Sequence, residues 1–304
     1  MKKTTKLTVL ITAFVLIGLA GCNTEEPLDT INEEVVDETT FAENIFEQLA
    51  SDVDEVSFYE MDASARIAEV TEGDKNRHRW SKRFGYSDCV TVTRDRPGPG
   101  EFPIIITIDY GDGCTSSMWD VVKSGKIIIT ITGKLSEEGS QRIVTFEEFY
   151  VNNNHIEGEF TFTNLGNASY SCVLVGGKIT TEDGGEITRD SERIRTRIEG
   201  GDTDDRLDDV FEITGNASGK TLSGDTYVMT ITKPLIRSLD CFWITSGTIE
   251  KVINDTLVIV IDFGDGACDN IATKQIGDED PEEFEMNCRM KRWNWLHRIR
   301  KVLN

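Results

Sequence analysis

Two hydrophobic patterns follow one another along the chain. Between Thr39 and Phe58 apolar side chains recur every three or four residues with acids between them, which predicts one amphipathic helix. From Cys89 onward the period changes to two, in short segments such as CVTVTR, IIITIDY, GKIIITITG and LVIVIDF. Clusters of glycine, asparagine and aspartate separate these segments, and no helical pattern lies between them. We therefore predict an all-β fold, an antiparallel sandwich or meander, with one N-terminal helix.

Nearly the same segment end occurs twice, as IDYGDGC and as IDFGDGAC. Before the second copy, the dipeptide Asn254-Asp255 favours a two-residue turn, since both residues tolerate the left-handed conformation. Such a turn sets Ile253 opposite Thr256 in a β-hairpin. The first copy has RPGPGEFP in the corresponding place, and its prolines and glycines predict a broader turn. Each copy is therefore predicted to be a hairpin.

Six cysteines remain besides Cys22, an even number that favours disulfides in an exported chain. The register of the second hairpin places Cys241 opposite Cys268, and a bulge in the first can bring Cys89 beside Cys114. We predict that each hairpin is closed by its own disulfide. The two cysteines left over would then pair by default, Cys172 with Cys288.

The aspartates of the repeated ends allow two interpretations. Carboxylate oxygens in short loops can bind calcium. Neither copy, however, has the full acidic ladder and terminal glutamate of an EF-hand loop, and alternation along a strand would divide the acids between its two faces. We favour a turn-forming role and keep a calcium site as the alternative for Asp109, Asp112, Asp262, Asp265 and Asp269.

The chain begins with a segment that has the composition of an export signal. In residues 1–21 three lysines precede an apolar run of 13 residues, which is too short to span a bilayer. The LAGC that ends at Cys22 resembles the bacterial lipoprotein signal, in which the cysteine is acylated and becomes the first residue. The resemblance implies a stable membrane anchor, because several acyl chains hold a protein in the membrane, whereas a single chain binds only marginally. The alternative is an ordinary secretory signal with an incidental cysteine.

The next residues, 22–38, are acidic and poor in aromatics, which is typical of a solvated tether. Glu25 and Glu26 resemble the surface-export tether of lipoproteins in the Bacteroidetes. With the helix, GKIIITITG, TFEEFYVNNNHIEGEFTFTN and the paired GDGC hairpins, most of the mature chain resembles a family of uncharacterised Bacteroidetes lipoproteins. The resemblance implies the outer membrane, exposure at the cell surface and the architecture above, and it implies no specific activity.

We divide the mature chain after the tether into three parts. Residues 39–88 form the helix and a basic connector, and residues 89–288 form the antiparallel β domain. That domain has two halves, near 89–182 and 183–288, that carry similar hairpins. Residues 289–304 form a basic tail.

Charge excludes one class of partner. The chain has 54 acids and 32 bases, a net charge of −22 that falls to about −25 once the three lysines of the signal are removed. Such a surface repels polyanions, so we expect no nucleic-acid partner.

The tail is basic although the rest of the chain is acidic. In CRMKRWNWLHRIRKVLN the spacing of Trp295, Ile299 and Val302 predicts a short amphipathic helix. One interpretation is contact with anionic lipid or with lipopolysaccharide phosphates. The alternative is docking onto the acidic surface of the same chain, or disorder. The residues concerned are Arg289, Lys291, Arg292, Trp293, Trp295, Arg298, Arg300 and Lys301.

Catalytic motifs are scarce. The chain has three histidines and lacks G-x-S-x-G, H-E-x-x-H and a phosphate-cradling glycine loop. Glu147 and Glu148 could serve a glycosidase, but neighbours on a strand face opposite sides. Aromatic residues could form a sugar-stacking platform or belong to the core, namely Tyr59, Trp80, Phe84, Tyr86, Trp119 and Trp243.

We therefore predict a lipid-anchored envelope protein, without a cofactor, that has a structural role or binds a glycan, lipopolysaccharide or a surface protein. The alternative is a carboxylate-dependent carbohydrate-active enzyme.

Overall fold

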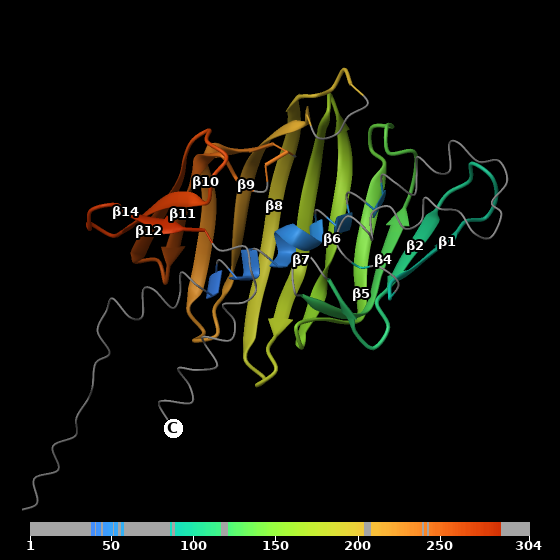
Figure 1. Ribbon diagram of the computed structural model, residues 1–304, viewed down its shortest axis with the longest axis horizontal. Coiled ribbons are helices and arrows are strands. Elements are labelled where there is room, and N and C mark those ends of the chain that lie inside the picture. Colours follow the sequence, from blue (N-terminus) through green and yellow to red (C-terminus); the bar gives the residue numbers. More distant parts are fainter. Residues whose placement is uncertain are drawn as a thin grey trace, which may run out of the picture.

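The computed structural model (Figure 1) describes residues 38–39, 41–43, 45–50, 52–53, 56–57, 86, 89–116, 121–203, 208–238, 240–241 and 243–286. The expected signal, the predicted lipidation site Cys22, most of the tether, Cys288 and the basic tail lie outside these residues. The described residues between 38 and 57 are helical, and fourteen strands follow in the described part of the chain. No described helix is long and apolar enough to cross a membrane.

All strands belong to one open antiparallel sheet in meander order, β1-β2-β4 and then consecutively to β14, with β3 paired to β4 at the side. The all-β prediction is confirmed, and of its two forms the meander is the one observed. The sheet continues without a break between the two predicted halves, because β7 and β8 pair there. The strands are β1 Thr91–Asp95, β2 Ile104–Asp109, β3 Cys114–Thr115, β4 Val122–Ile131, β5 Gln141–Val151, β6 Asn154–Gly166, β7 Ser169–Thr180, β8 Glu186–Glu199, β9 Val210–Lys220, β10 Thr226–Ser238, β11 Ser246–Ile253, β12 Leu257–Asp265, β13 Ile271–Ile276 and β14 Glu282–Glu285.

The turn between β11 and β12 forms where it was predicted, but the register after it is shifted by one residue. Asn254 and Asp255 have positive φ angles of 48° and 58°, and the Thr256 N–H donates to the Ile253 carbonyl at 3.0 Å. Ile253 then pairs with Leu257, and not with Thr256 as predicted. The reason is that Thr256 remains within the turn, which makes a three-residue loop.

Both predicted hairpin disulfides are confirmed. Cys89 is bonded to Cys114 and Cys241 to Cys268, with Cα atoms 5.5 and 5.9 Å apart. Cys172 is buried on β7. Because Cys288 lies outside the described residues, its pairing with Cys172 stays a prediction.

The face of the sheet that contacts the helix, here called the inner face, carries two buried apolar clusters. The first extends from the helix and β2 to Ile187 at the start of β8. The second extends from Phe211 on β9 to Ala272 on β13. The rest of the inner face of β8 therefore lies between two apolar cores.

The helix runs across the strands rather than along them (Figure 1). Thr39 near its start contacts Lys251 of β11, and Asp52 near its end contacts Lys123 of β4. Seven strand-to-strand steps separate β4 from β11, about 34 Å along a flat sheet. The helix covers only about 20 Å between these two residues. Long lysine side chains bridge part of the difference, and the rest requires the sheet to curl around the helix.

Candidate functional site

Three arginines lie on the inner face of β8, where apolar side chains would be expected. Arg189, Arg193 and Arg195 have side chains that are 2%, 3% and 7% exposed. They share a face with Ile187, since strand residues two apart point the same way. In the same strand Ile194 and Ile198 point outward and are 45% and 49% exposed. Beyond Ile187, β8 thus has these three arginines inside and its isoleucines outside.

Glycines on the neighbouring strands flank two of these arginines. Arg189 pairs with Gly177 of β7 and Gly219 of β9, and Arg193 pairs with Gly215 of β9. Paired residues of antiparallel strands project from the same face, so these glycines add no side chain of their own beside Arg189 and Arg193. The arginines can therefore extend toward the helix.

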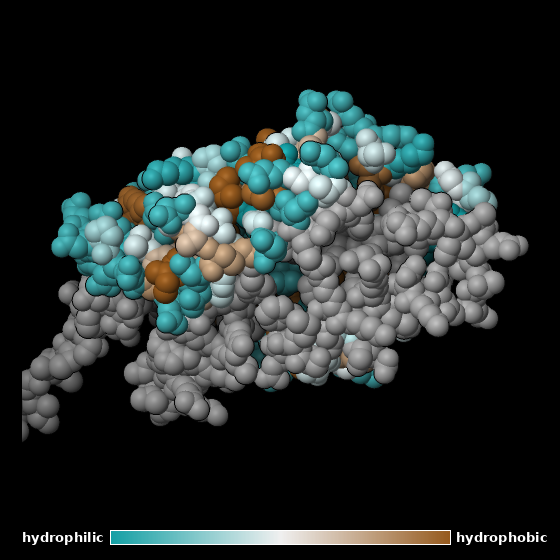
Figure 2. Space-filling model, turned by 45° about the horizontal axis from the view of Figure 1, so that its top comes forward, coloured by the Kyte–Doolittle hydropathy of each residue, from teal (hydrophilic) through white to brown (hydrophobic). Residues whose placement is uncertain are grey.

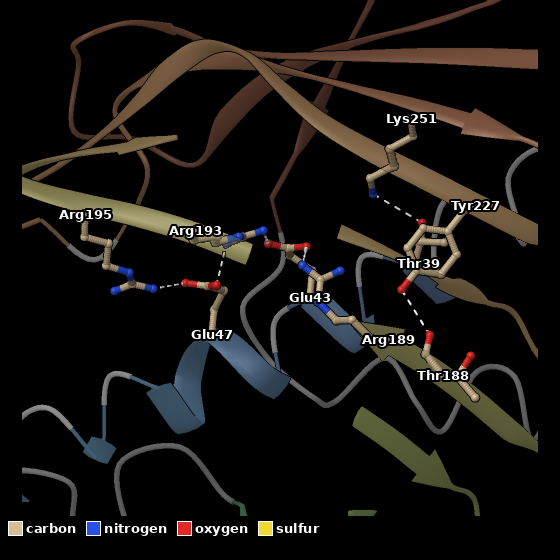
Figure 3. A network of polar contacts seen from close by, with 9 residues as sticks. All are labelled: Thr39, Glu43, Glu47, Thr188, Arg189, Arg193, Arg195, Tyr227 and Lys251. Carbon is tan, nitrogen blue, oxygen red and sulfur yellow. Dashed lines mark hydrogen bonds and ion pairs between the residues drawn. The ribbon is translucent and has the colours of Figure 1, made fainter. Parts of the chain in front are cut away.

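On the helix, Glu43 and Glu47 meet these arginines (Figure 3). The two glutamates are four residues apart and so lie on one side of the helix. Arg193 binds both carboxylates, Arg195 binds Glu47, and Arg189 Nη2 lies 2.5 Å from Glu43 Oε2. The charges alternate in a row that starts at Arg189 and ends at Arg195. We call these five side chains the arginine clamp.

The clamp holds its carboxylates in the ionised form. Burial alone would raise the pKa of Glu43, but Arg189, Arg193 and Lys251 outweigh burial and lower that pKa from 4.5 to about 2. Burial likewise acts to raise the pKa of Glu47, but the neighbouring guanidinium groups outweigh burial and lower that pKa. At neutral pH every member of the clamp is therefore charged, and its contacts are charge-assisted.

Beyond the clamp, a buried ion pair fixes the end of the helix. Lys123 Nζ lies 2.5 Å from Asp52 Oδ2, and Gln48 Nε2 donates to Asp52 Oδ1 at 2.8 Å. The rings of Tyr86 and Tyr110 lie 5.2 and 5.5 Å from Lys123 Nζ. Burial would lower the pKa of Lys123, but Asp52 raises it well above its ordinary value, so the lysine is charged.

The start of the helix is held by polar contacts to the second half of the sheet. Lys251, which is buried on β11, donates to Thr39 Oγ1 at 3.2 Å. Glu38 is also buried, and its carboxylate accepts from the backbone N–H of Leu222 at 2.8 Å. The helix is thus attached to the sheet at its start, its middle and its end.

The aspartates of the repeated ends take part in turns. Asp109, Asp262 and Asp269 each accept the backbone N–H two residues later, at 2.8, 2.9 and 3.0 Å. Asp112 and Asp265 are exposed. Among the described residues no group of three or more His, Cys, Asp or Glu side chains is arranged to hold a metal ion. These contacts support the turn-forming interpretation.

Other predicted site residues do not come together. Tyr86 is buried in ring contact with Tyr110, so it belongs to the core and cannot serve a sugar platform. Glu147 and Glu148 are exposed, and Glu147 forms a 3.5 Å ion pair with Lys126. Trp243 is partly buried. The remaining candidates lie outside the described residues, namely Cys22, Tyr59, Trp80, Phe84, Trp119, Cys288 and the basic residues of the tail.

The arginine clamp was not predicted. Its signal is the arginine at every second position in SERIRTR, in phase with Ile187, but the outward isoleucines of the same strand favour the opposite orientation. Comparisons of the chain with protein-family models, with curated proteins and with solved structures find no match. The class that the fold defines is an open antiparallel meander wrapped around its own helix.

Proposed function

We propose that this chain is a lipid-anchored protein of the bacterial outer membrane, exposed at the cell surface, whose role is structural or to bind a partner. One observation carries the structural part of this proposal. The concave face of the sheet, where a ligand or substrate would otherwise enter, is occupied by the chain's own helix, with Ile45, Leu49 and Val53 at most 1% exposed. A partner is then left with the outer face, the sheet edges and the loops.

The clamp suits a protein that is held by its N-terminus. Glu38, the first described helical residue, is 16 positions after Cys22, a reach of at most about 55 Å. A lipid on Cys22 would therefore pull on the helix rather than on an edge strand. The buried ion pairs of Glu43, Glu47 and Asp52 connect that helix to β8 and β4. In this proposal they carry the load between the membrane and the sheet.

The exposed side chains and the net charge restrict the kind of partner that we propose for the outer face. The exposed large apolar side chains include Val175 on β7 and both Ile194 and Ile198 on β8, and the side of the molecule drawn in Figure 2 shows small apolar patches among hydrophilic ones. A net charge of about −25 disfavours a polyanion. We propose a glycan or a surface protein as the partner, and lipopolysaccharide only through the basic tail. The alternative of a carbohydrate-active enzyme gains no support from Glu147 and Glu148, which lie exposed on the surface.

Protease treatment of intact cells tests the location. We expect the wild-type protein to be cleaved on intact cells, a Cys22→Ser variant to leave the membrane fraction, and a Glu25→Ala/Glu26→Ala variant to be protected. If the wild type is protected until the outer membrane is permeabilised, the cell-surface proposal is wrong. If it is recovered apart from membranes, the anchor is wrong.

A second experiment separates binding from catalysis. The mature chain carrying Cys22→Ser is run through gels that contain surface polysaccharide, and the same mixtures are assayed for new reducing ends. We expect retardation without new reducing ends. Release of reducing ends that is lost in Glu147→Gln or Glu148→Gln would favour the enzyme instead.

A further inference from the structure

A stacked pair of rings lies on the outer face at the end of the β5–β6 hairpin. Tyr150 pairs with His155, and their ring centroids are 4.8 Å apart with an interplanar angle of 28°. The residues on either side of Tyr150 are buried, so its own side chain points outward. The imidazole is 30% exposed.

This pair is not part of either apolar core. Between described residues, the members of every other ring pair belong to the two buried clusters of the inner face or pack against them. Packing of the core therefore does not explain why two rings stack on the outer face. Aromatic side chains in such a position offer an apolar contact area beside polar groups.

A β-bulge places an additional carboxylate next to the rings. The pairing of β4 with β5 shifts by one residue around Gly125, where a Cβ would lie 1.8 Å from the Glu148 carbonyl oxygen. Phe146 and Phe149 both pack in the first apolar cluster, and both residues between them, Glu147 and Glu148, are exposed. Regular alternation would have turned one of these glutamates inward.

The bulge strains the backbone of Glu148. Its φ angle is 44°, and it is the one described non-glycine residue within a strand whose φ is positive. A residue with a side chain keeps such an angle only where the surrounding structure imposes it, and strain of this kind is concentrated at functional sites.

Hydrogen-bond acceptors flank the rings on both sides. The Tyr150 hydroxyl donates to Glu148 Oε2 at 3.4 Å, and His155 Nδ1 lies 3.7 Å from Glu157 Oε2. An apolar centre with acceptors at its rim is complementary to a sugar ring, which has an apolar face of C–H groups and a rim of hydroxyl donors.

We propose that Glu148, Tyr150, His155 and Glu157 bind the terminal sugar of a neutral glycan. The sugar lies against the ring pair, and its hydroxyl groups donate to the two carboxylates in charge-assisted hydrogen bonds. This inference rests on the proposed glycan-binding role and assigns that role to one site on the outer face.

The charges around the site favour a neutral sugar. Glu147, Glu148 and Glu157 would repel the carboxylate of a uronic or sialic acid. Lys126 lies 3.5 Å from Glu147 and Lys178 lies 2.6 Å from Glu157, so two of the three carboxylates already have a cation beside them. A cationic ligand therefore gains less here than it would at unpaired acids.

His155 gives the first test, because the chain has only three histidines. NMR of the mature chain carrying Cys22→Ser follows the imidazole C–H signals, and His155→Gln identifies the signal of His155. Methyl glycosides of glucose, galactose, mannose and xylose are titrated, with glucuronate and choline as charged probes. We expect at least one neutral glycoside to shift this signal saturably, with a Kd on the order of 1 mM for so small a ligand. No saturable shift with any of the four, or a shift only with a charged probe, overturns the proposal.

Variants assign binding to the site. Tyr150→Ala should weaken the glycoside about tenfold, whereas Tyr150→Phe keeps the ring and most of the affinity. Glu148→Gly should also weaken binding about tenfold, although its urea midpoint should stay equal or rise, because glycine relieves the strained φ. Glu192→Gln, an exposed carboxylate on the outer face of β8, is the control and should bind as the wild type does. Unchanged affinity in Glu148→Gly, or a lower urea midpoint, would mean that the strained glutamate serves the fold and not a ligand.

Failure of this site and failure of the proposed function have different results. If surface polysaccharide in a gel retards the wild type and Tyr150→Ala equally, the glycan binds elsewhere, so this site is wrong and the proposed function stands. If no polysaccharide retards the wild type, the proposed glycan partner is itself wrong. If Tyr150→Ala does not fold, the His155 titration and Glu148→Gly still decide.

Discussion

Asp52 of the helix and Lys123 of β4 are 71 residues apart in the sequence, and their side chains form a 2.5 Å ion pair that is 3% and 4% exposed. A pair buried to this extent gains little over a well-packed apolar pair, because both charges leave water. Removing only one of the two side chains is costly, because the remaining charge is then buried without its partner. The pair therefore specifies where the end of the helix must lie.

Removing the lysine alone should strongly destabilise the protein. We expect Lys123→Met to lower the free energy of unfolding by about 3–5 kcal/mol, since Asp52 is left uncompensated. The matched control is Lys126→Met on the same strand. Lys126 pairs with Glu147 at 3.5 Å, with side chains 38% and 57% exposed, so its loss should cost at most about 1 kcal/mol. Urea unfolding monitored by circular dichroism measures both.

The double variant Lys123→Met/Asp52→Leu separates charge from packing. It should recover much of the stability lost in Lys123→Met, because no buried charge remains. Equal losses in Lys123→Met and Lys126→Met would mean that the pair does not hold the helix.

The sheet could be predicted from the sequence because its signals are local. Period-two alternation, turn residues and the spacing of Cys241 and Cys268 each concern neighbours along one hairpin. The one-residue shift after Asn254 could not be predicted, because a two-residue and a three-residue loop use the same asparagine and aspartate. Which of the two loops forms depends on which residues of β12 must be buried against the rest of the fold.

The arginine clamp could not be predicted because its partners are 146 to 150 residues apart. By hydrophobicity alone, β8 should bury Ile194 and Ile198 and expose its arginines. The observed orientation is set by Ile187, which joins the first apolar cluster, and by the glutamates that the helix brings to the inner face. When the hydrophobic pattern of a strand conflicts with its orientation, as in β8, that orientation can be predicted only once the element packed against the strand is known.

Acid should weaken the clamp within a defined pH range. The pKa of Glu43 is about 2 in the folded protein and 4.5 ordinarily, so protonation favours the unfolded chain as the pH falls. The stabilisation is complete above about pH 4.5 and is lost progressively toward pH 2. Its size is on the order of 3 kcal/mol. We expect Glu43→Gln to flatten the dependence of unfolding free energy on pH across this range.

Glu192→Gln is the control, because Glu192 lies exposed on the other face of the same strand as the clamp arginines. It should leave the slope between pH 5 and pH 2 close to that of the wild type. If Glu43→Gln and Glu192→Gln give the same slope, Glu43 is not held ionised by the arginines.

Each hairpin disulfide should contribute separately to stability. The bridges close loops with sequence separations of 25 and 27, so either one should stabilise by about 3.5 kcal/mol through the unfolded chain. We expect Cys89→Ser/Cys114→Ser and Cys241→Ser/Cys268→Ser to lower the urea midpoint by similar amounts. Peptide mapping without reductant checks the pairing. A peptide that joins Cys89 to Cys268 would contradict both the structure and the expected effect.

A methyl group at Gly219 should disturb the sheet beside the clamp. A Cβ there would lie 1.9 Å from the Thr188 carbonyl oxygen, which is backbone and cannot turn aside as a side chain would. That oxygen also accepts the Tyr227 hydroxyl at 3.2 Å, so β8 and β9 must separate and this contact must shift. We expect Gly219→Ala to lower the free energy of unfolding by about 3 kcal/mol, the upper end of overpacking costs.

Gly113→Ala is the matched control, because its Cβ would lie 3.7 Å from a Val122 methyl, which is an ordinary contact. The free energy of unfolding of this variant should change by less than about 1 kcal/mol. Thermal and urea unfolding of the two variants measure the difference, and equal stabilities would mean that β8 and β9 do not approach as closely as the clamp requires.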